Sequence, residues 1–262
     1  MKMKVHVYSL EGKPVEEIEL PAIFDEQFRP DIIKRAVLAA QSARFQPSGA
    51  DWMAGKRTSA ETWGKGHGVA RVRRVKGIRY PAAGRGAFVP FTSGGRRAHP
   101  PKVEKVLRER INRKERRLAV RSAVAATKKK KLVSSRGHVA GSVAEFPLVV
   151  TDEFEGLGRA SRAKEILRKL GLWQDVERVA KSKRVRAGRG KMRGRRYRQA
   201  VGPLIVVDED KGIKLGARNL PGVEVVEVRN LNAEKLAPGG VPGRLTAWTK
   251  GAIQKLAGGL FT

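Results

Sequence analysis

The chain opens with alternating apolar and polar residues, which is the pattern of β-strands. The alternation covers residues 4–8 and 15–20, and Gly12 and Pro14 between them favour a tight turn. Residues 31–44 then show helical periodicity. The apolar face of this predicted helix consists of Ile32, Ile33, Ala36, Val37 and Ala40. This opening predicts a pair of strands followed by a helix that packs on a sheet.

Short apolar runs farther along the chain predict buried strands over residues 146–150 and 203–207, and residues 223–228 are a third strand candidate. Continuous apolar strands are typical of parallel sheets that are covered on both faces. The intervening patterns predict helices over residues 102–131, 161–170 and 246–256, the second of them with Gly171 as its C-cap. Strands separated by helices imply βαβ units, so the fold class is α/β.

Two segments break these patterns. Residues 44–101 follow neither a strand nor a helix period, and they hold twelve Lys or Arg against two acids. Residues 181–198 hold ten Lys or Arg and no acid. Irregular connections longer than about 15 residues are uncommon in compact domains unless they are functional or disordered. We therefore predict a single α/β domain over residues 1–262, with a long extended loop at about 44–101 and a second basic loop at about 181–198.

The charge of the chain requires an anionic partner. Lys and Arg number 56 and Asp and Glu 25, which gives a net charge of +31. A membrane surface, an acidic protein or a nucleic acid could neutralise it, and its concentration in two irregular segments favours nucleic acid. Residues 1–10 lack the apolar stretch of a signal peptide, and no window approaches the roughly 20 apolar residues that span a bilayer. The expectation is a soluble cytoplasmic protein without a membrane partner.

The residue types in the two basic segments suit irregular RNA. Cationic side chains neutralise phosphates, glycines allow close backbone approach, and aromatic rings stack on unpaired bases. The predicted RNA-contacting residues of the first segment are Arg44, Lys56, Arg57, Trp63, Lys65, His67, Arg71, Arg73, Arg74, Lys76, Arg79, Arg85, Arg96 and Arg97. Those of the second are Arg184, Arg186, Arg189, Lys191, Arg193, Arg195, Arg196 and Arg198. The alternative for the first segment is a solvated linker. The alternative for the second is a nuclear-localisation patch or a disordered tail.

Catalytic motifs are weak by comparison. The glycines of residues 64–68 lack dinucleotide-binding spacing, and residues 188–192 lack the Ser or Thr of a P-loop. Asp152 and residues 208–210 follow predicted strands. Acids at such positions either bind a ligand or Mg²⁺, or serve as turn and helix-cap residues. Without cysteine, disulfides and thiolate zinc sites are excluded. We expect no enzyme activity, no catalytic or metal-binding residues and no cofactor, with any structural Mg²⁺ held mainly by RNA.

The four histidines are too scattered in sequence to form a metal motif. We expect His6 to pack within its strand, and His67 and His99 to contact RNA.

Several segments resemble the archaeal and eukaryotic branch of the fourth protein of the large ribosomal subunit, the L-four family. The segments that carry the resemblance are residues 69–72, 94–96, 117–126, 137–138, 146–150, 186–196 and 236–240. The resemblance implies a three-layer α/β/α body bound to large-subunit rRNA, with a long loop that reaches the wall of the nascent-peptide exit tunnel. Residues 67–79 would then lie near the tunnel constriction. Arg71 and Arg74 match basic positions of the loop tip, whereas Arg73 replaces a common proline.

The resemblance also implies the partners and the role of the chain. It would be a structural constituent of the ribosome that supports assembly and contacts large-subunit rRNA, neighbouring ribosomal proteins and, near the loop tip, the nascent peptide. It would not form a homo-oligomer. We expect the long loop to be disordered in the free protein and ordered on rRNA. The rival hypotheses are a free-standing RNA chaperone or regulatory RNA-binding protein, and a Mg²⁺-dependent RNA-modifying enzyme that uses Asp152 and Asp208.

Overall fold

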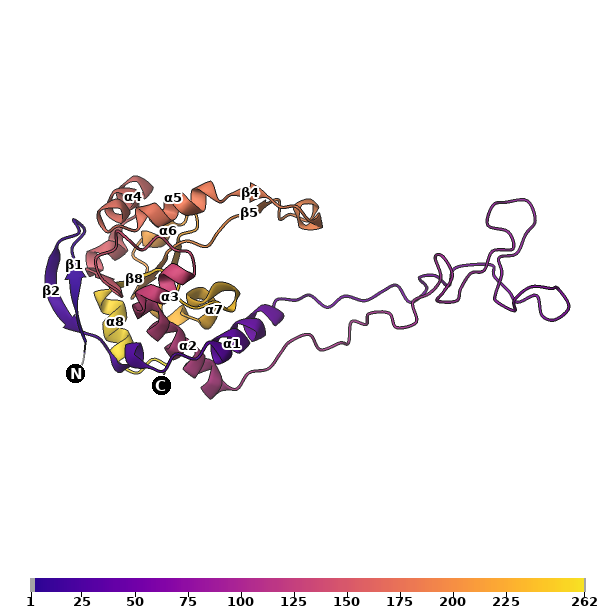
Figure 1. Cartoon of the computed structure of the whole chain (residues 1–262), viewed down its shortest axis with the longest axis horizontal. Coiled ribbons are helices and arrows are strands. Elements are labelled where there is room, and N and C mark those ends of the chain that lie inside the picture. Colours follow the sequence, from indigo (N-terminus) through magenta and orange to yellow (C-terminus); the bar gives the residue numbers. More distant parts are fainter. Residues whose placement is uncertain (1–2, 262) are drawn as a thin grey trace. The chain divides into compact units, whose positions relative to one another are not determined.

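A six-stranded sheet forms the centre of the fold in the computed structural model, which describes residues 3–261 (Figure 1). Its strands are β1 (Lys4–Tyr8), β2 (Pro14–Glu19), β3 (Leu148–Val150), β6 (Leu204–Val207), β7 (Glu224–Glu227) and β8 (Thr246–Thr249). The order across the sheet is β2-β1-β3-β8-β6-β7. The β1 and β2 strands pair antiparallel, as predicted, and every other pair is parallel.

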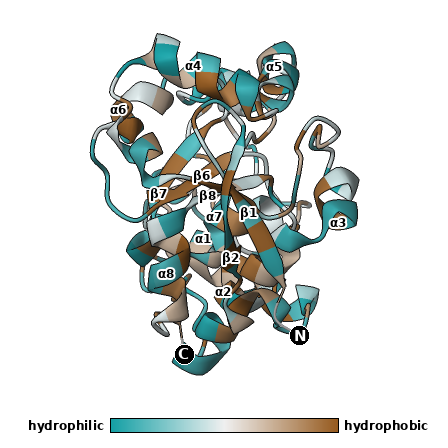
Figure 2. Ribbon diagram, turned by 90° about the vertical axis from the view of Figure 1, so that its left-hand side faces the viewer, coloured by the Kyte–Doolittle hydropathy of each residue, from teal (hydrophilic) through white to brown (hydrophobic). Residues whose placement is uncertain are grey.

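Helices cover both faces of the sheet (Figure 2). One face carries α1 (Pro30–Ser42), α2 (Arg113–Lys128), α7 (Ala233–Leu236) and α8 (Lys250–Ala257). The other carries α3 (Lys130–Ser135), α4 (Ala160–Lys169), α5 (Trp173–Lys181) and α6 (Ile213–Ala217). Short 3₁₀ helices lie at Ala22–Asp25, Asp152–Gly156, Arg189–Met192, Val228–Asn230 and Pro238–Gly240. The three-layer α/β/α class with a mainly parallel sheet is confirmed.

The apolar strand runs supply both hydrophobic cores. Successive side chains of a strand point to opposite faces. Val149 and Val206 therefore pack in the core with α1 and α2, whereas Val150 and Val207 pack in the core with α4 and α5. Trp248 on β8 is fully buried in the first core.

The predicted helix over residues 102–131 is wrong at both ends. Residues 102–112 are not helical, and α2 begins at Arg113. Val103 and Val106 remain 57% and 83% exposed, so the first turns of the predicted helix have no surface on which to bury an apolar face. Most helical stability in proteins comes from such packing. Near its other end the helix breaks at Lys129, which is extended, within a run of four lysines whose like charges disfavour a continuous helix.

The predicted helix over residues 246–256 is also partly wrong. Its first four residues form β8, which lies between β3 and β6, and only the remainder belongs to α8. Four residues are too few to show a period, so their apolar pattern merges with that of the helix that follows them. All four residues of β8 are buried, because helices cover both faces of the sheet at this position.

Smaller differences concern single residues. Ala40 is exposed and Ala39 takes its place on the buried face of α1. His6 does not pack inside the sheet: its Nδ1 lies 2.8 Å from Glu145 Oε1 and its Nε2 lies 3.4 Å from Glu17 Oε1, on a partly exposed side chain. Gly171 follows α4 with a φ of +75° and donates its N–H to Arg168 O, as expected of a glycine that ends a helix.

Residues 43–108 form a compact unit of their own, which we call the basic unit. The rest of the described chain, residues 3–42 and 109–261, is called the body. None of the named helices and strands of the described chain falls in the basic unit. In the body, residues 184–198 form a small hairpin, the basic hairpin, from β4 (Arg184–Val185) and β5 (Tyr197–Arg198).

Candidate nucleic-acid interface

Turns and isolated bridges organise the basic unit. Arg74 is central, because its backbone pairs with Glu61 and its neighbours on either side bond to residues 84–87. The Arg74 Nη1 also donates to Gly84 O at 3.0 Å. Gly55 allows another close approach, since a Cβ at this position would lie 2.4 Å from the backbone of residues 95–96. Backbone hydrogen bonds thus fold the unit back on itself without a hydrophobic core.

Aromatic rings in the basic unit have two kinds of environment. The Arg73 guanidinium lies 4.4 Å from the Phe88 ring centre, and that of Arg74 lies 5.5 Å from the Trp63 ring. These cation–π contacts hold two arginines against the fold. Trp52 and Phe91, in contrast, are each 77% exposed, so their faces are open to a stacking partner.

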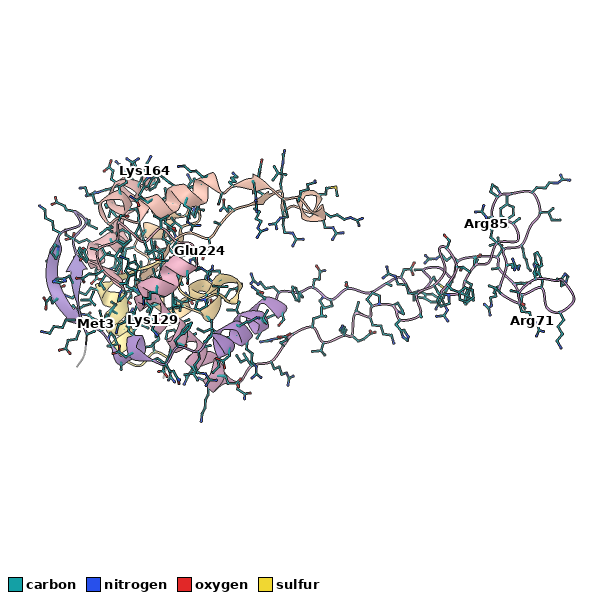
Figure 3. All side chains as sticks on the ribbon, in the orientation of Figure 1. Met3, Arg71, Arg85, Lys129, Lys164 and Glu224 are labelled. Carbon is teal, nitrogen blue, oxygen red and sulfur yellow. The ribbon has the colours of Figure 1, made fainter. Side chains whose placement is uncertain are left out.

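The residues predicted to contact RNA are all accessible. Lys56, Arg74, Arg96 and Arg186 are partly buried, and every other predicted residue is exposed. Side chains project from the ribbon along the basic unit, those of Arg71 and Arg85 among them (Figure 3). Ion pairs join Arg57 to Asp51 and Lys76 to Glu61 within the unit. Since the unit has 15 Lys or Arg and three acids, internal pairing cannot neutralise it.

The basic hairpin is held by its backbone and by one aromatic ring. Arg186 N donates to Arg196 O at 2.9 Å, and Arg186 Nε donates to Arg195 O at 3.0 Å. Lys183 and Arg196 lie 4.7 and 5.5 Å from the Tyr197 ring. With no acid in residues 181–198, the hairpin has no internal counter-charge.

The same serine contact closes the base of both basic segments. Ser42, the last residue of α1, donates its hydroxyl to Ala39 O and accepts the N–H of Glu109 at 3.0 Å. Ser182, the C-cap of α5, donates to Val179 O and accepts the N–H of Ala200 at 2.9 Å. Each serine therefore joins a helix end to the chain that returns from a basic segment. We call these two contacts the serine clasps.

A buried ionic cluster, which the sequence patterns do not predict, lies beside the returning end of the basic hairpin. It consists of Arg136, His138, Asp175 and Arg178. Asp175 is fully buried and accepts hydrogen bonds from Val139 N at 2.9 Å and Arg178 Nε at 2.8 Å. Its Oδ2 lies 2.9 Å from His138 Nδ1, which donates when it carries the proton because an ionised carboxylate only accepts.

The cluster shifts the pKa values of its members. Burial alone would raise the pKa of Asp175, but hydrogen bonds from His138 and Arg178 hold that pKa below its ordinary value. Burial lowers the pKa of His138 below its ordinary value of 6.5 and outweighs the opposing hydrogen bond with Asp175. One sequence signal was available: Asp175 occupies the same helix face as Leu172 and Val179, both of which are buried.

Comparison with known proteins identifies the family. Residues 18–259 match the ribosomal protein L4/L1 family. The large ribosomal subunit protein uL4 of Methanopyrus kandleri is 56% identical over 97% of this chain and 98% of its own length. The proteins of the same name from Methanosphaera stadtmanae and Pyrobaculum aerophilum are 54% and 53% identical, over 98% and 97% of this chain and 97% and 89% of their own lengths. The chain belongs to the ribosomal protein L4/L1 family.

Membership of the ribosomal protein L4/L1 family confirms the resemblance and makes the chain a large-subunit ribosomal protein, not an enzyme. The acids that suggested a magnesium enzyme have other partners. Asp152 Oδ1 accepts the N–H of Gly251 at 2.7 Å, and Asp208 pairs with Lys255. Asp210 Oδ1 accepts the N–H groups of Gly212 and Lys214 at 3.1 Å each. Asp210 thus makes the contacts of a turn and helix-start residue, whereas Asp152 and Asp208 hold α8 by longer-range contacts.

Metal-binding clusters and membrane-spanning helices are both missing from the described residues. Between residues 3 and 261, no group of three or more His, Asp or Glu is arranged to hold a metal ion. No helix in that range is long and apolar enough to cross a membrane.

The serine clasps predict a specific loss of stability. Ser42→Ala and Ser182→Ala should each lower the free energy of unfolding by about 1 kcal/mol, because a backbone N–H loses its acceptor. Ser135→Ala is the matched control, since Ser135 donates to Leu132 O at a helix end but has no clasp contact of this kind. Urea unfolding measures all three. If the control variant loses as much stability as the other two, the clasp contributes nothing.

The ionic cluster predicts a pH dependence. Below pH 6.5 His138 takes up a proton more readily in the unfolded chain than in the folded chain, where its pKa is lowered. The free energy of unfolding of the wild type therefore falls as pH decreases. His138→Asn should lower the free energy of unfolding by about 1–3 kcal/mol at pH 8. The difference in the free energy of unfolding between the variant and the wild type should then become smaller from pH 6.5 to pH 5. Asp175 does not contribute to this change, because its protonation affects stability only below its ordinary pKa of 3.8. Urea unfolding at pH 8, 6.5 and 5 tests this, and a constant gap would be the contrary result.

Proposed function

We propose that the chain binds large-subunit rRNA through the basic unit and the segment 181–198. The observation that carries this proposal is the distribution of charge. The basic unit has a net charge of +12, from 15 cations and three acids, and residues 181–198 add +10. These two segments thus hold 22 of the 31 net charges in 84 of 262 residues. The body provides the folded platform from which both segments leave.

Counter-ion release provides the binding free energy. Each phosphate that a Lys or Arg neutralises frees condensed cations from the RNA, so affinity falls steeply as salt rises. The accessible side chains of the predicted RNA-contacting residues suit this role. Trp52 and Phe91, both largely exposed, add surfaces on which unpaired bases stack. Such binding suits the crowded, irregular junctions of folded RNA.

The tip of the basic unit is proposed to line part of the nascent-peptide exit tunnel. Family resemblance suggests this role for residues 67–79, and three features of the fold are compatible with it. Residues 61–71 are exposed throughout, and Ile78 is 94% exposed. Both Arg71 and Arg73 are exposed. The guanidinium of Arg73, where the family commonly has proline, lies over the Phe88 ring, whereas Arg71 projects outward (Figure 3). Arg71 is therefore the better candidate for contact with RNA or a nascent peptide.

The remaining parts of the proposal follow from placement in a ribosome. The chain would support assembly by screening phosphate repulsion where RNA helices meet, and it would contact neighbouring large-subunit proteins. It would act in the cytoplasm as one copy per particle, and structural Mg²⁺ would reside mainly on rRNA. Nothing in this role requires turnover.

A salt titration tests the proposal. We expect a quintuple variant of the basic hairpin, with Arg184, Arg189, Lys191, Arg193 and Arg195 changed to Gln, to bind large-subunit rRNA more weakly. The slope of log K against log[salt] should become shallower by roughly 0.7–0.9 for each phosphate that the variant no longer neutralises. Filter binding or fluorescence anisotropy between about 50 and 200 mM KCl measures the slope.

The control removes the same charge from the body. Lys4, Arg162, Lys169, Lys214 and Arg218 are exposed and lie outside the two basic segments. Changing these five to Gln should leave most of the slope intact. Equal slopes for the two quintuple variants would show that total charge, and not the proposed segments, determines binding.

A further inference from the structure

We propose that Arg136 and Arg178 form a specific binding site for one phosphate group of the RNA backbone, in a small cavity beside His138. This inference rests on the proposed function, because it takes the ligand to be rRNA. It names a site in the body, whereas the predicted RNA-contacting residues all lie in the basic unit and the basic hairpin.

An imbalance of charge is the first observation. Arg178 and Arg244 both lie close enough to Arg136 to repel its guanidinium group. Arg178 pairs with Asp175, and Arg244 pairs with Glu224. Among residues 3–261, no carboxylate forms an ion pair with Arg136. An anion is the partner that this arrangement lacks.

The hydrogen bonding of Arg136 gives the second observation. Its Nη2 donates to Pro238 O at 2.7 Å, which fixes the orientation of the guanidinium. Its Nη1 is buried and has no hydrogen-bond partner. Burial, together with repulsion from Arg244 and Arg178, lowers the pKa of Arg136 to about 10. A buried, unsatisfied donor on a cation is costly, and an anion in the neighbouring cavity would lower that cost by offsetting the charge.

A cavity of about 200 Å³ gives the third observation, and it is lined by Arg136, His138, Arg178, Ala200, Val201 and Val241. One water molecule occupies about 30 Å³ in the liquid, so a phosphate group fits with room for solvent. Its lining has two guanidinium groups and an imidazole but no carboxylate, so it favours an anion.

Hydrogen bonds orient both guanidinium groups in the absence of a ligand. Arg178 is held by Asp175 through Nε at 2.8 Å and by Val201 O through Nη2 at 2.9 Å. Two fixed guanidinium groups provide the planar donor arrays that match phosphate oxygens. Ala200 and Val201 follow the basic hairpin directly in the chain, and Ala200 is the residue held by the Ser182 clasp. An RNA strand that follows the hairpin to its base would therefore bring its phosphates to this cavity.

Titration of the whole protein with inorganic phosphate tests the site. NMR of the arginine Nε–H and histidine ring signals, in about 150 mM KCl, reports each residue separately. We expect the Arg136 and His138 signals to shift together and saturate, while the signal of the exposed Arg162 drifts without saturation. Arg136→Met should abolish the His138 shift, and Arg162→Met, which removes the same charge, should retain it. Uniform, unsaturated drift at all arginines would overturn the proposal.

A second arm separates RNA from free phosphate as the source of the ligand. Arg136→Lys keeps the charge but removes the planar array, and we expect it to bind large-subunit rRNA about 10-fold more weakly than wild type. Thermal unfolding establishes that this variant folds. Wild-type affinity in a folded Arg136→Lys variant would refute an RNA phosphate at this site. Failure of the wild-type protein to bind rRNA would instead refute the proposed function. In that case the phosphate titration would still show whether the cavity binds phosphate.

Discussion

Repulsion between like charges is the constraint on which the rest of this structure depends. The basic unit and residues 181–198 have 25 cations and three acids between them, and the second segment has no acid at all. Neither segment has a hydrophobic core of the kind that stabilises the body, because the buried apolar residues belong to the body. Their internal order comes from backbone hydrogen bonds, a few ion pairs and cation–π contacts, which are individually weak. In the proposed function, rRNA would supply the missing stabilisation by neutralising these cations.

The body is built to hold such segments. Its central parallel strands β3, β6 and β8 are buried on both faces, so the body does not depend on RNA for its stability. Both basic segments begin at a helix end, and in both a serine at that end accepts an N–H from the returning chain. Each clasp thus holds the two ends of a basic segment together. The buried cluster of Arg136, His138, Asp175 and Arg178 then adds fixed positive charge at the base of the hairpin.

The sequence predicts the parts of this fold that periodicity and composition control. Apolar spacing predicts the N-terminal strand pair, α1, α4, the buried strands β3 and β6 and the partly buried edge strand β7 to within a few residues of their bounds. β8 could not be separated from α8, because a central strand of four residues has no measurable period. The start of α2 depends on where a packing partner becomes available, which Val103 and Val106 lack.

For the candidate site, the sequence predicts the two basic segments, because they contain many cationic residues and few or no acidic ones. The sequence does not predict the serine clasps or the Arg136 cavity, because their contacts join residues that are 18 to 102 positions apart. Asp175 is the exception, because an acid on the apolar face of a helix signals a buried partner. Composition therefore reveals a binding surface, whereas a binding pocket depends on tertiary contacts between distant residues.

Hydrogen exchange tests the central claim most directly. The amides of Arg74 and Ala87, which bridge the basic unit, and that of Arg186 in the hairpin are compared with those of Ile205 and Trp248 in the sheet. We expect the sheet amides to be protected with and without large-subunit rRNA. The amides of Arg74, Ala87 and Arg186 should be protected only in its presence. Strong protection of Arg74, Ala87 and Arg186 in the free chain would contradict the claim that polyanion stabilises the folded shape of the two segments.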